Sequence, residues 1–131
     1  MSAREPGDDA EIRNVIGTYS QCVDDRRFDD LRAVLADDFT FDVGGDVVHG
    51  AAAFVERLSS RPAPDHPRAH MTSNVVVRVG AEGDHATTTV DLLYVGRGAD
   101  GTWTILSRAR YDDELVKRDG RWLFRSRRVR S

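Results

Sequence analysis

The sequence has one cysteine among its 131 residues, so no disulfide can form within the chain. That cysteine, Cys22, lies in an apolar stretch, where it is expected to pack as a small hydrophobic side chain. No apolar run approaches the ~20 residues that a membrane-spanning helix needs. Residues 1–9 are polar and acidic and lack the hydrophobic segment of a secretory signal. These absences predict a cytoplasmic protein without a membrane partner.

The sequence also lacks an excess of basic residues. The chain carries 22 acidic and 19 basic side chains, which gives a net charge of −3. A nucleic-acid-binding domain needs a basic surface to neutralise phosphates, so no nucleic acid is expected as a partner. The arginines clustered in residues 125–130 are interpreted as the solvated side of a last strand.

The length fits a single domain that can bury a core of its own. We expect a disordered lead over residues 1–8 and one domain over residues 9–130. Apolar residues recur at helical spacing over residues 12–23, which predicts a first helix. Asp8 or Asp9 is expected to cap that helix.

Two shorter amphipathic stretches predict further helices, around residues 28–35 and 51–58. The remaining apolar segments alternate or are β-branched and are separated by turn signals. They predict strands over residues 39–43, 47–48, 75–79, 86–95, 103–117 and 122–129. Helices followed by a meander of strands indicate an α+β fold, with three N-terminal helices packed on a mostly antiparallel sheet.

Signatures of metal, phosphate and nucleophile sites are also lacking. The four histidines form no pair at the spacing of metal ligands. The sequence has no phosphate-binding glycine loop and no nucleophile elbow. We therefore expect neither a metal nor an organic cofactor, and any chemistry must come from scattered side chains that meet in a pocket.

Two residues are candidates for such a pocket. Asp24 directly follows the apolar face of the first predicted helix, which would leave its carboxylate half-buried. His70 lies where the proline-containing segment 59–67 enters a strand, and Asn74 follows four residues later. Taken singly, each is compatible with an ordinary solvated side chain.

The long predicted strand over residues 103–117 supplies a candidate pocket wall. One of its faces mixes aromatic, small and polar side chains, as ligand pockets do; these are Trp103, Ile105, Ser107, Ala109, Tyr111, Asp113 and Leu115. The opposite face carries charged residues and is expected to meet solvent or a partner; these are Arg108, Arg110, Asp112 and Glu114.

Several loose motifs, taken in order, resemble the SnoaL-like proteins of the nuclear-transport-factor-two-like superfamily. They are Tyr19-x4-Asp24-x3-Phe28-Asp29-x-Leu31, Leu35-Ala36-Asp37-Asp38-Phe39, Val48-His49-Gly50 and Tyr111-x-Asp113-x3-Lys117-Arg118-Asp119-Gly120-x-Trp122. The resemblance extends over nearly the whole chain. It implies a cone-shaped α+β barrel, with the three helices on a curved sheet.

Within that superfamily the sequence looks most like the branch of scytalone dehydratase and hexachlorocyclohexane dehydrochlorinase. Both use an aspartate at the end of the first helix and a histidine at the start of a central strand as an acid–base dyad. Asp24 matches the aspartate, and His70 matches the histidine through its His-x3-Asn step. The dehydratase's second histidine has no counterpart here, Val23 replaces a tyrosine, and Tyr19 stands where the dehydrochlorinase has a lysine.

The resemblance implies a cofactor-free lyase or isomerase that acts on a small, mostly apolar molecule. Asp24 and His70 would be catalytic. The side chains expected to contact the substrate are Tyr19, Phe41, Phe54, Asn74, Tyr94, Trp103, Tyr111 and Asp113. Self-association is expected, as a homodimer or alternatively a trimer.

Three other functions fit the same pattern. The fold forms a pocket whether or not it catalyses a reaction, so the chain can be a ligand-binding module. A purely structural dimer is a further alternative. An epoxide hydrolase is the enzymatic alternative, because related folds use Asp–Arg–Asp sets and Asp91, Asp113 and Arg128 supply those residue types.

Overall fold

The computed structural model describes residues 7–131, which form three helices and six strands. The helices are α1 (Asp8–Asp24), α2 (Phe28–Ala33) and α3 (Ala51–Ser59). The strands are β1 (Leu35–Val43), β2 (Asp46–His49), β3 (Arg68–Val79), β4 (His85–Arg97), β5 (Trp103–Arg118) and β6 (Arg121–Arg130). Helices thus cluster at the start of the chain, and the predicted α+β class is confirmed.

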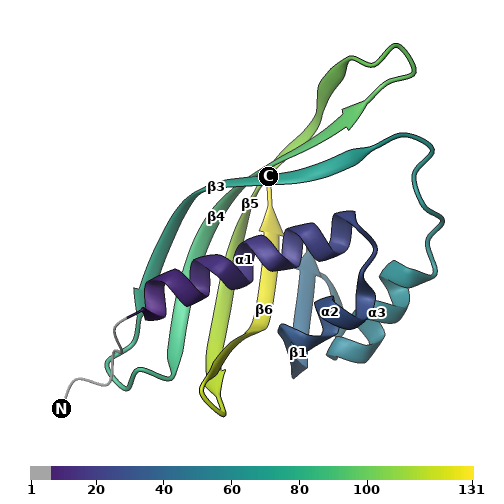
Figure 1. The fold of residues 1–131 in the computed structure, drawn as a ribbon. Coiled ribbons are helices and arrows are strands. Elements are labelled where there is room, and N and C mark those ends of the chain that lie inside the picture. Colours follow the sequence, from purple (N-terminus) through teal and green to yellow (C-terminus); the bar gives the residue numbers. More distant parts are fainter. Residues whose placement is uncertain (1–6) are drawn as a thin grey trace.

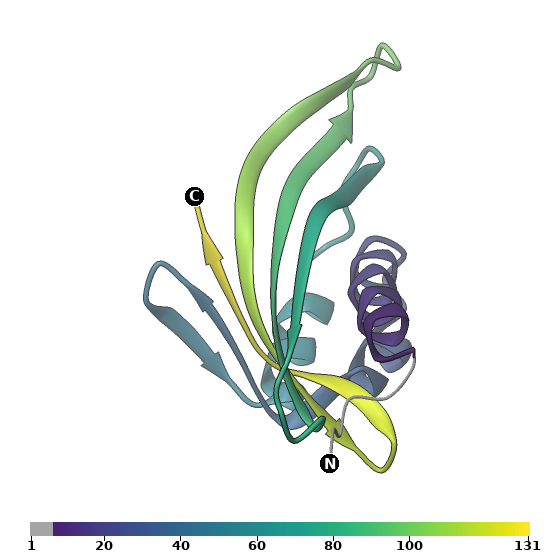
Figure 2. The same ribbon diagram turned by 90° about the vertical axis from the view of Figure 1, so that its left-hand side faces the viewer.

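All six of these strands belong to one sheet, in the order β2-β1-β6-β5-β4-β3. Neighbouring strands are antiparallel, apart from the parallel pair of β1 and β6. The sheet curves strongly, α1 lies along its concave side, and the β4–β5 hairpin extends beyond the other strands (Figures 1 and 2). The curved sheet is confirmed, but it remains open: β2 and β3 are its two edges, so the expected barrel does not close.

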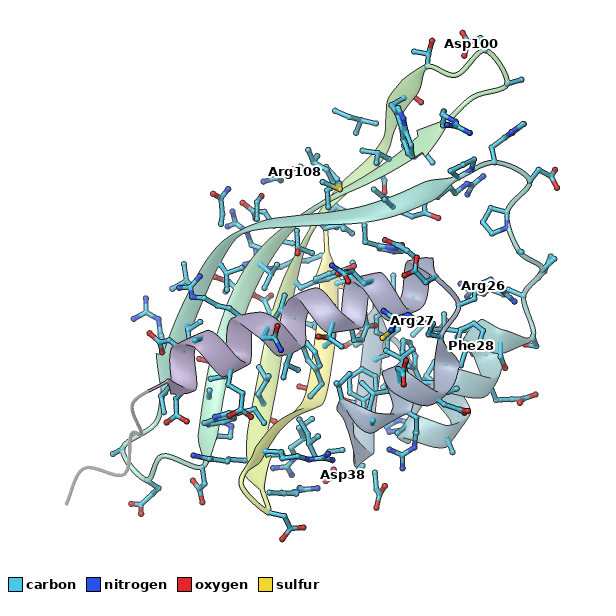
Figure 3. The ribbon with its side chains drawn as sticks, in the orientation of Figure 1. Arg26, Arg27, Phe28, Asp38, Asp100 and Arg108 are labelled. Carbon is cyan, nitrogen blue, oxygen red and sulfur yellow. The ribbon has the colours of Figure 1, made fainter. Side chains whose placement is uncertain are left out.

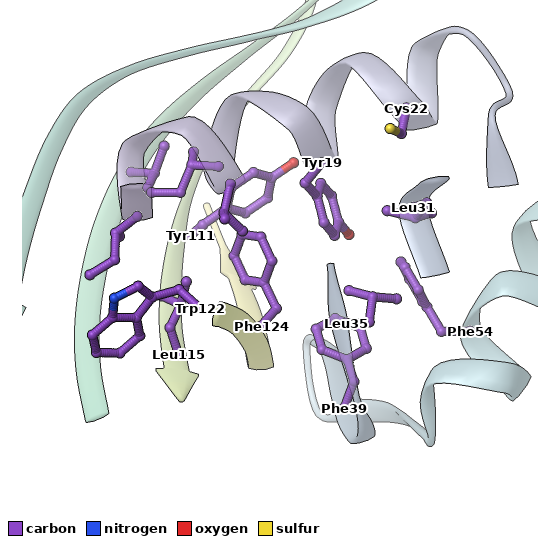
Figure 4. Packing of buried hydrophobic residues seen from close by; sticks show 14 of the residues in the cluster. Tyr19, Cys22, Leu31, Leu35, Phe39, Phe54, Tyr111, Leu115, Trp122 and Phe124 are labelled. Carbon is purple, nitrogen blue, oxygen red and sulfur yellow. The ribbon is translucent and has the colours of Figure 1, made fainter. Parts of the chain in front are cut away.

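The core lies between α1 and the concave face of the sheet (Figure 4). On α1, Ile12, Ile16 and Tyr19 recur on one helical face and are buried. They pack with buried residues of β5 and β6, which include Leu115, Trp122 and Phe124. Phe39 and Phe54 extend the same cluster toward β1 and α3.

The start of the domain differs slightly from the prediction. Asp8 is the first residue of α1 and is buried, so it belongs to the domain and not to the lead. Its carboxylate accepts a hydrogen bond from Trp122 Nε1 (2.9 Å) and one from Lys117 Nζ (3.2 Å). Gly7 occupies the N-cap position and no side chain caps the helix there. Residues 1–6 of the predicted lead lie outside the described residues.

Two element boundaries also differ. Helix α2 ends at Ala33, because the next residues pair with β6: the Phe124 N–H donates to the Val34 carbonyl (2.9 Å). Strand β3 begins at Arg68, seven residues before the predicted start, and contains a bulge between Ser73 and Val76. Such a bulge adds an unpaired residue and changes which side chains face the core.

We expect Ile16→Ala to lower the free energy of unfolding by roughly 2–5 kcal/mol, because truncating a buried isoleucine loses apolar contacts and leaves a cavity. Ile16 is only 1% exposed. Urea denaturation of the purified protein measures the effect. Val76→Ala is the control, since Val76 lies on an exposed position of β3; equal losses in the two variants would contradict this packing of α1.

Candidate functional site

The C-terminal end of α1 and the first half of β3 bring Asp24 and His70 together. Asp24 Oδ1 lies 2.6 Å from His70 Nδ1, and Asp24 Oδ2 accepts a hydrogen bond from the backbone N–H of His70 (2.9 Å). Both carboxylate oxygens are therefore used by one residue. The side chains are mostly buried, with 16% of Asp24 and 23% of His70 exposed. The predicted contact between these two residues is confirmed.

The position of β3 at the edge of the sheet makes this double contact possible. His70 pairs with Tyr94 of β4 on one side, while the other side of β3 has no neighbouring strand. An edge strand presents backbone N–H groups that its sheet does not satisfy. The His70 N–H is one of these groups, and Asp24 accepts it. The family resemblance placed this histidine on a central strand, which is wrong for this chain.

The contact favours one tautomer of the neutral imidazole. An ionised carboxylate can only accept hydrogen bonds, so Asp24 favours the tautomer in which Nδ1 carries the proton. The lone pair of the neutral ring is then on Nε2. Asp24 also stabilises the imidazolium that forms if Nε2 takes up a proton.

An aromatic ring completes the immediate surroundings of His70. The Tyr94 ring lies 4.5 Å from the imidazole, between centroids, and the Arg68 guanidinium lies 6.0 Å from the Tyr94 centroid. Arg68, His70 and Tyr94 therefore share the concave side of the sheet. Of the residues expected to contact a substrate, Tyr94 is the one placed directly against the dyad histidine.

A buried ion pair lies deeper on the same face. Arg127 Nε and Nη2 donate to the two carboxylate oxygens of Asp113 (2.7 and 2.9 Å), and Thr88 donates to Asp113 Oδ2 (3.1 Å). Neither ionic side chain is exposed. Three rings surround the guanidinium, with centroids 3.8, 4.3 and 4.6 Å away; they belong to Tyr111, Tyr19 and Phe124.

Sequence reasoning predicted Asp113 on the inner face but missed Arg127. In the sequence Arg127 is one arginine among several, and a uniform alternation from Trp122 and Phe124 would send it outward. A shift in the β5–β6 register between Glu114 and Leu115 reverses that expectation. The usable signal was the buried carboxylate itself, which requires a cationic partner.

Burial raises the pKa of both tyrosines beside Arg127. Burial raises the pKa of the Tyr19 phenol well above its usual range, against the opposing charge of Arg127. Burial likewise raises the pKa of Tyr111, against the opposing charge of Arg127, and the negative charges of Asp113 and then Asp24 add to that shift. Both phenols are O–H donors at neutral pH, and the charge of Asp24 acts on Tyr111.

Phe41 and Phe54 belong to the core packing. Their ring centroids are 4.8 Å apart, and Phe54 also packs against Phe39 and Tyr19. Phe54 is almost completely buried. A substrate would meet the Phe54 ring only after displacing other side chains, whereas Phe41 is partly exposed and packs against the core.

Asn74 and Trp103 do not approach the dyad. Asn74 adopts a positive φ of 52° at the bulge, and its side chain donates to Asp91, which is bonded to Arg110 on the opposite face. Trp103 is 50% exposed at the start of β5. It lies in the projecting hairpin whose far end is marked by Asp100 (Figure 3). The expectation that both line the pocket is wrong in this arrangement.

The Asp–Arg–Asp set of the epoxide hydrolase alternative is not assembled. Its three members are in separate ion pairs, namely Asp91 with Arg110, Asp113 with Arg127, and Arg128 with Asp112. Hydrogen bonds from Arg110 and Asn74 lower the pKa of Asp91 to about 2. A carboxyl group that stays ionised at neutral pH cannot serve as a general acid there.

Two hollows lie away from the dyad. One, of about 380 Å³, is lined by polar residues of β1, β4, β5 and β6, and the other, of about 440 Å³, lies between α2 and the β5–β6 turn. Neither is lined by Asp24 or His70. The expected closed apolar pocket around the pair is not confirmed. In the part of the chain that the structure describes, no three histidine, cysteine or carboxylate side chains converge as metal ligands would.

The family model of the SnoaL-like domain matches residues 4–128. The chain belongs to the SnoaL-like family. The uncharacterised protein Rv2910c of Mycobacterium tuberculosis is 31% identical over 130 residues, covering 93% of this chain and 84% of the relative. Among the helices of residues 7–131, none has the length and apolar character required to cross a membrane.

Solved structures share the fold of this SnoaL-like domain. An NTF2-like protein with a cystatin-like fold from Novosphingobium aromaticivorans has a TM-score of 0.83 at 21% identity, covering 93% of this chain and 80% of its own. A putative scytalone dehydratase from the same organism has a TM-score of 0.77 at 23% identity, with coverages of 92% and 81%. At these identities the likeness establishes the fold.

We predict that Asp113→Asn will lower the free energy of unfolding of this SnoaL-like domain by about 3 kcal/mol, because it leaves the buried Arg127 charge uncompensated. The substitution keeps the shape of the side chain. Asp112→Asn is the matched control. Asp112 directly precedes Asp113 and pairs with Arg130 at the surface, where an ion pair contributes roughly 1 kcal/mol or less. Urea denaturation compares the two, and similar losses would refute a special role for the buried pair.

Proposed function

We propose that this chain is a small-molecule lyase or isomerase in which Asp24 and His70 form an acid–base dyad. The observation that supports it best is the use of both Asp24 oxygens by His70, one at the ring and one at the backbone N–H. The two contacts hold the carboxylate against the imidazole ring. That is the arrangement which orients an imidazole as a general base.

In the proposed reaction, His70 Nε2 removes a proton from a carbon or hydroxyl group of the substrate. The electron pair of the broken bond forms a new double bond. In an elimination a leaving group departs with its own pair, and in an isomerisation the imidazolium returns the proton at another carbon. General base catalysis of this kind contributes roughly 10²–10⁴-fold. Asp24 balances the positive charge that His70 carries between the two steps.

The chain's tyrosines are available for charge that develops on a substrate oxygen. Tyr94 lies against His70, and Tyr111 remains a protonated donor within the field of Asp24. A hydrogen bond that strengthens as negative charge builds up stabilises the transition state more than the ground state. The resemblance to the dehydratase branch favours the same reaction class.

A homodimer through the convex face of the sheet is also proposed. That face exposes Met71 and Leu93, which are cross-strand neighbours. Along β5 it carries two arginines followed by two carboxylates at alternate positions, namely Arg108, Arg110, Asp112 and Glu114. A two-fold axis near the middle of this run would place the arginines of each copy against the carboxylates of the other.

Replacing Asp24 by Asn or His70 by Gln should lower turnover by about 10²-fold or more, and the double variant should lose little further because the two residues act as one unit. Turnover is measurable before the product is known: cyclic ketones are incubated in D₂O, and NMR follows the exchange of the protons next to the carbonyl. His85→Gln is the control, since His85 also contacts a carboxylate, Glu114 (3.0 Å), outside the site.

A ligand-binding module would behave differently in the same assay. It would bind ketones without exchanging their protons, and the single variants would leave the exchange rate unchanged. Nitrogen NMR of His70 gives a second readout: the Nδ1–H tautomer expected in the native protein should be lost in Asp24→Asn. Exchange at the native rate in both single variants would overturn the dyad.

Sedimentation at micromolar concentration should show a dimer, and Leu93→Asp should convert it to a monomer, because a buried unpaired carboxylate is costly. Val43→Asp is the control, on an exposed position of β1. A native protein that sediments as a monomer, or as a trimer, would contradict the two-fold arrangement.

A further inference from the structure

One arginine, Arg68, lies beside Asp24 and His70 without a carboxylate partner among the described residues. Arg68 lies two residues before His70 on β3, so the two side chains point to the same face of the sheet. No carboxylate of residues 7–131 forms an ion pair with Arg68, whereas the other arginine on this face, Arg127, is paired with Asp113. The Arg68 guanidinium instead lies 6.0 Å from the centroid of the Tyr94 ring.

Apolar surface adjoins this free cation. Gly96 pairs with Arg68 across the strands, and Leu106 lies over the glycine: a Cβ added at Gly96 would be 2.8 Å from Leu106 Cδ1 and 3.7 Å from Arg68 Cγ. The missing side chain thus lets Leu106 and the Arg68 stem lie together on the strand. Leu106 is 48% exposed, which leaves its outer side open to a ligand.

Together these residues form a surface with an apolar part and a cationic part. Tyr94 offers apolar area next to His70, Leu106 offers more beside Arg68, and Arg68 adds a planar guanidinium. A guanidinium can hold a carboxylate through two parallel hydrogen bonds. A positive charge at this place would also offset the repulsion that a substrate carboxylate meets from Asp24.

We propose that the site takes an apolar carboxylic acid, with its carboxylate on Arg68 and its apolar part over Tyr94 and Leu106. Two residues along a strand span roughly 6.6 Å. The carbon that reacts at His70 is therefore separated from the carboxylate by several bonds. This inference rests on the proposed function, since it assigns the substrate class of the same site.

The test compares 2-naphthoate with the uncharged 2-naphthamide, both titrated into the native protein while NMR follows the His70 ring. The native protein should bind the acid roughly fivefold more tightly than the amide, as expected for one partly exposed ion pair. Arg68→Gln should remove that preference and leave the affinity for the amide unchanged. Arg68→Lys should retain part of it, because the charge stays but the planar fork is lost.

Arg97→Gln is the matched control. Arg97 also lacks a carboxylate partner in the described part of the chain and lies 6.0 Å from an aromatic centroid, that of Trp103, but alternation along β4 puts it on the opposite face from Tyr94. It should bind both probes like the native protein.

Equal effects of the two arginine variants would overturn the proposal, as would an acid that binds no better than the amide or not at all. These outcomes are independent of the dyad, because the titrations need no turnover. Loss of acid preference in Arg68→Gln together with unchanged exchange chemistry in Asp24→Asn would keep the binding proposal and reject the catalytic one.

Discussion

The free edge of β3 is the constraint on which the site depends. A strand at the edge of a sheet has N–H groups without partners, and in this molecule the end of α1 supplies one with a carboxylate. The same carboxylate then reaches the imidazole of the same residue. The crossing of α1 over the concave face, which buries Ile12, Ile16 and Tyr19, is what brings the helix end to that edge. Core packing and site geometry are therefore coupled.

The interior of the domain is not uniformly apolar. Arg127 donates two hydrogen bonds to Asp113, but its Nη1 is buried without an acceptor among residues 7–131. The faces of the surrounding rings take the place of that acceptor, since a guanidinium is attracted to aromatic faces. A charge held in this way polarises the phenols of Tyr19 and Tyr111. The buried end of the concave face thus holds an ion pair beside two phenol O–H donors, although solvent does not reach it.

The order of helices and strands could be predicted from periodicity, because it follows from which residues must be buried. The pairing of Asp24 with His70 could be predicted only through the family motifs, since 46 residues separate the partners. Arg127, Asn74 and the edge position of β3 could not. Each depends on register shifts or strand order, which arise from pairing between distant segments and leave no local pattern. The expected pocket lining failed for the same reason at Asn74.

The bulge in β3 has a consequence for how the strand can vary. Before it, Arg68 and His70 face the concave side; after it, Val75, Val77 and Val79 pack against the core. Regular alternation would put even and odd positions on opposite faces, so the extra residue is what allows both sets to point inward. The strand therefore consists of two segments, each with its own alternation of inward-facing and outward-facing side chains. Deleting one residue at the bulge would leave a regular strand that still points both sets inward, whereas deleting two would put the segments on opposite faces and exchange the dyad histidine for Met71 or the core valines for their solvent-facing neighbours.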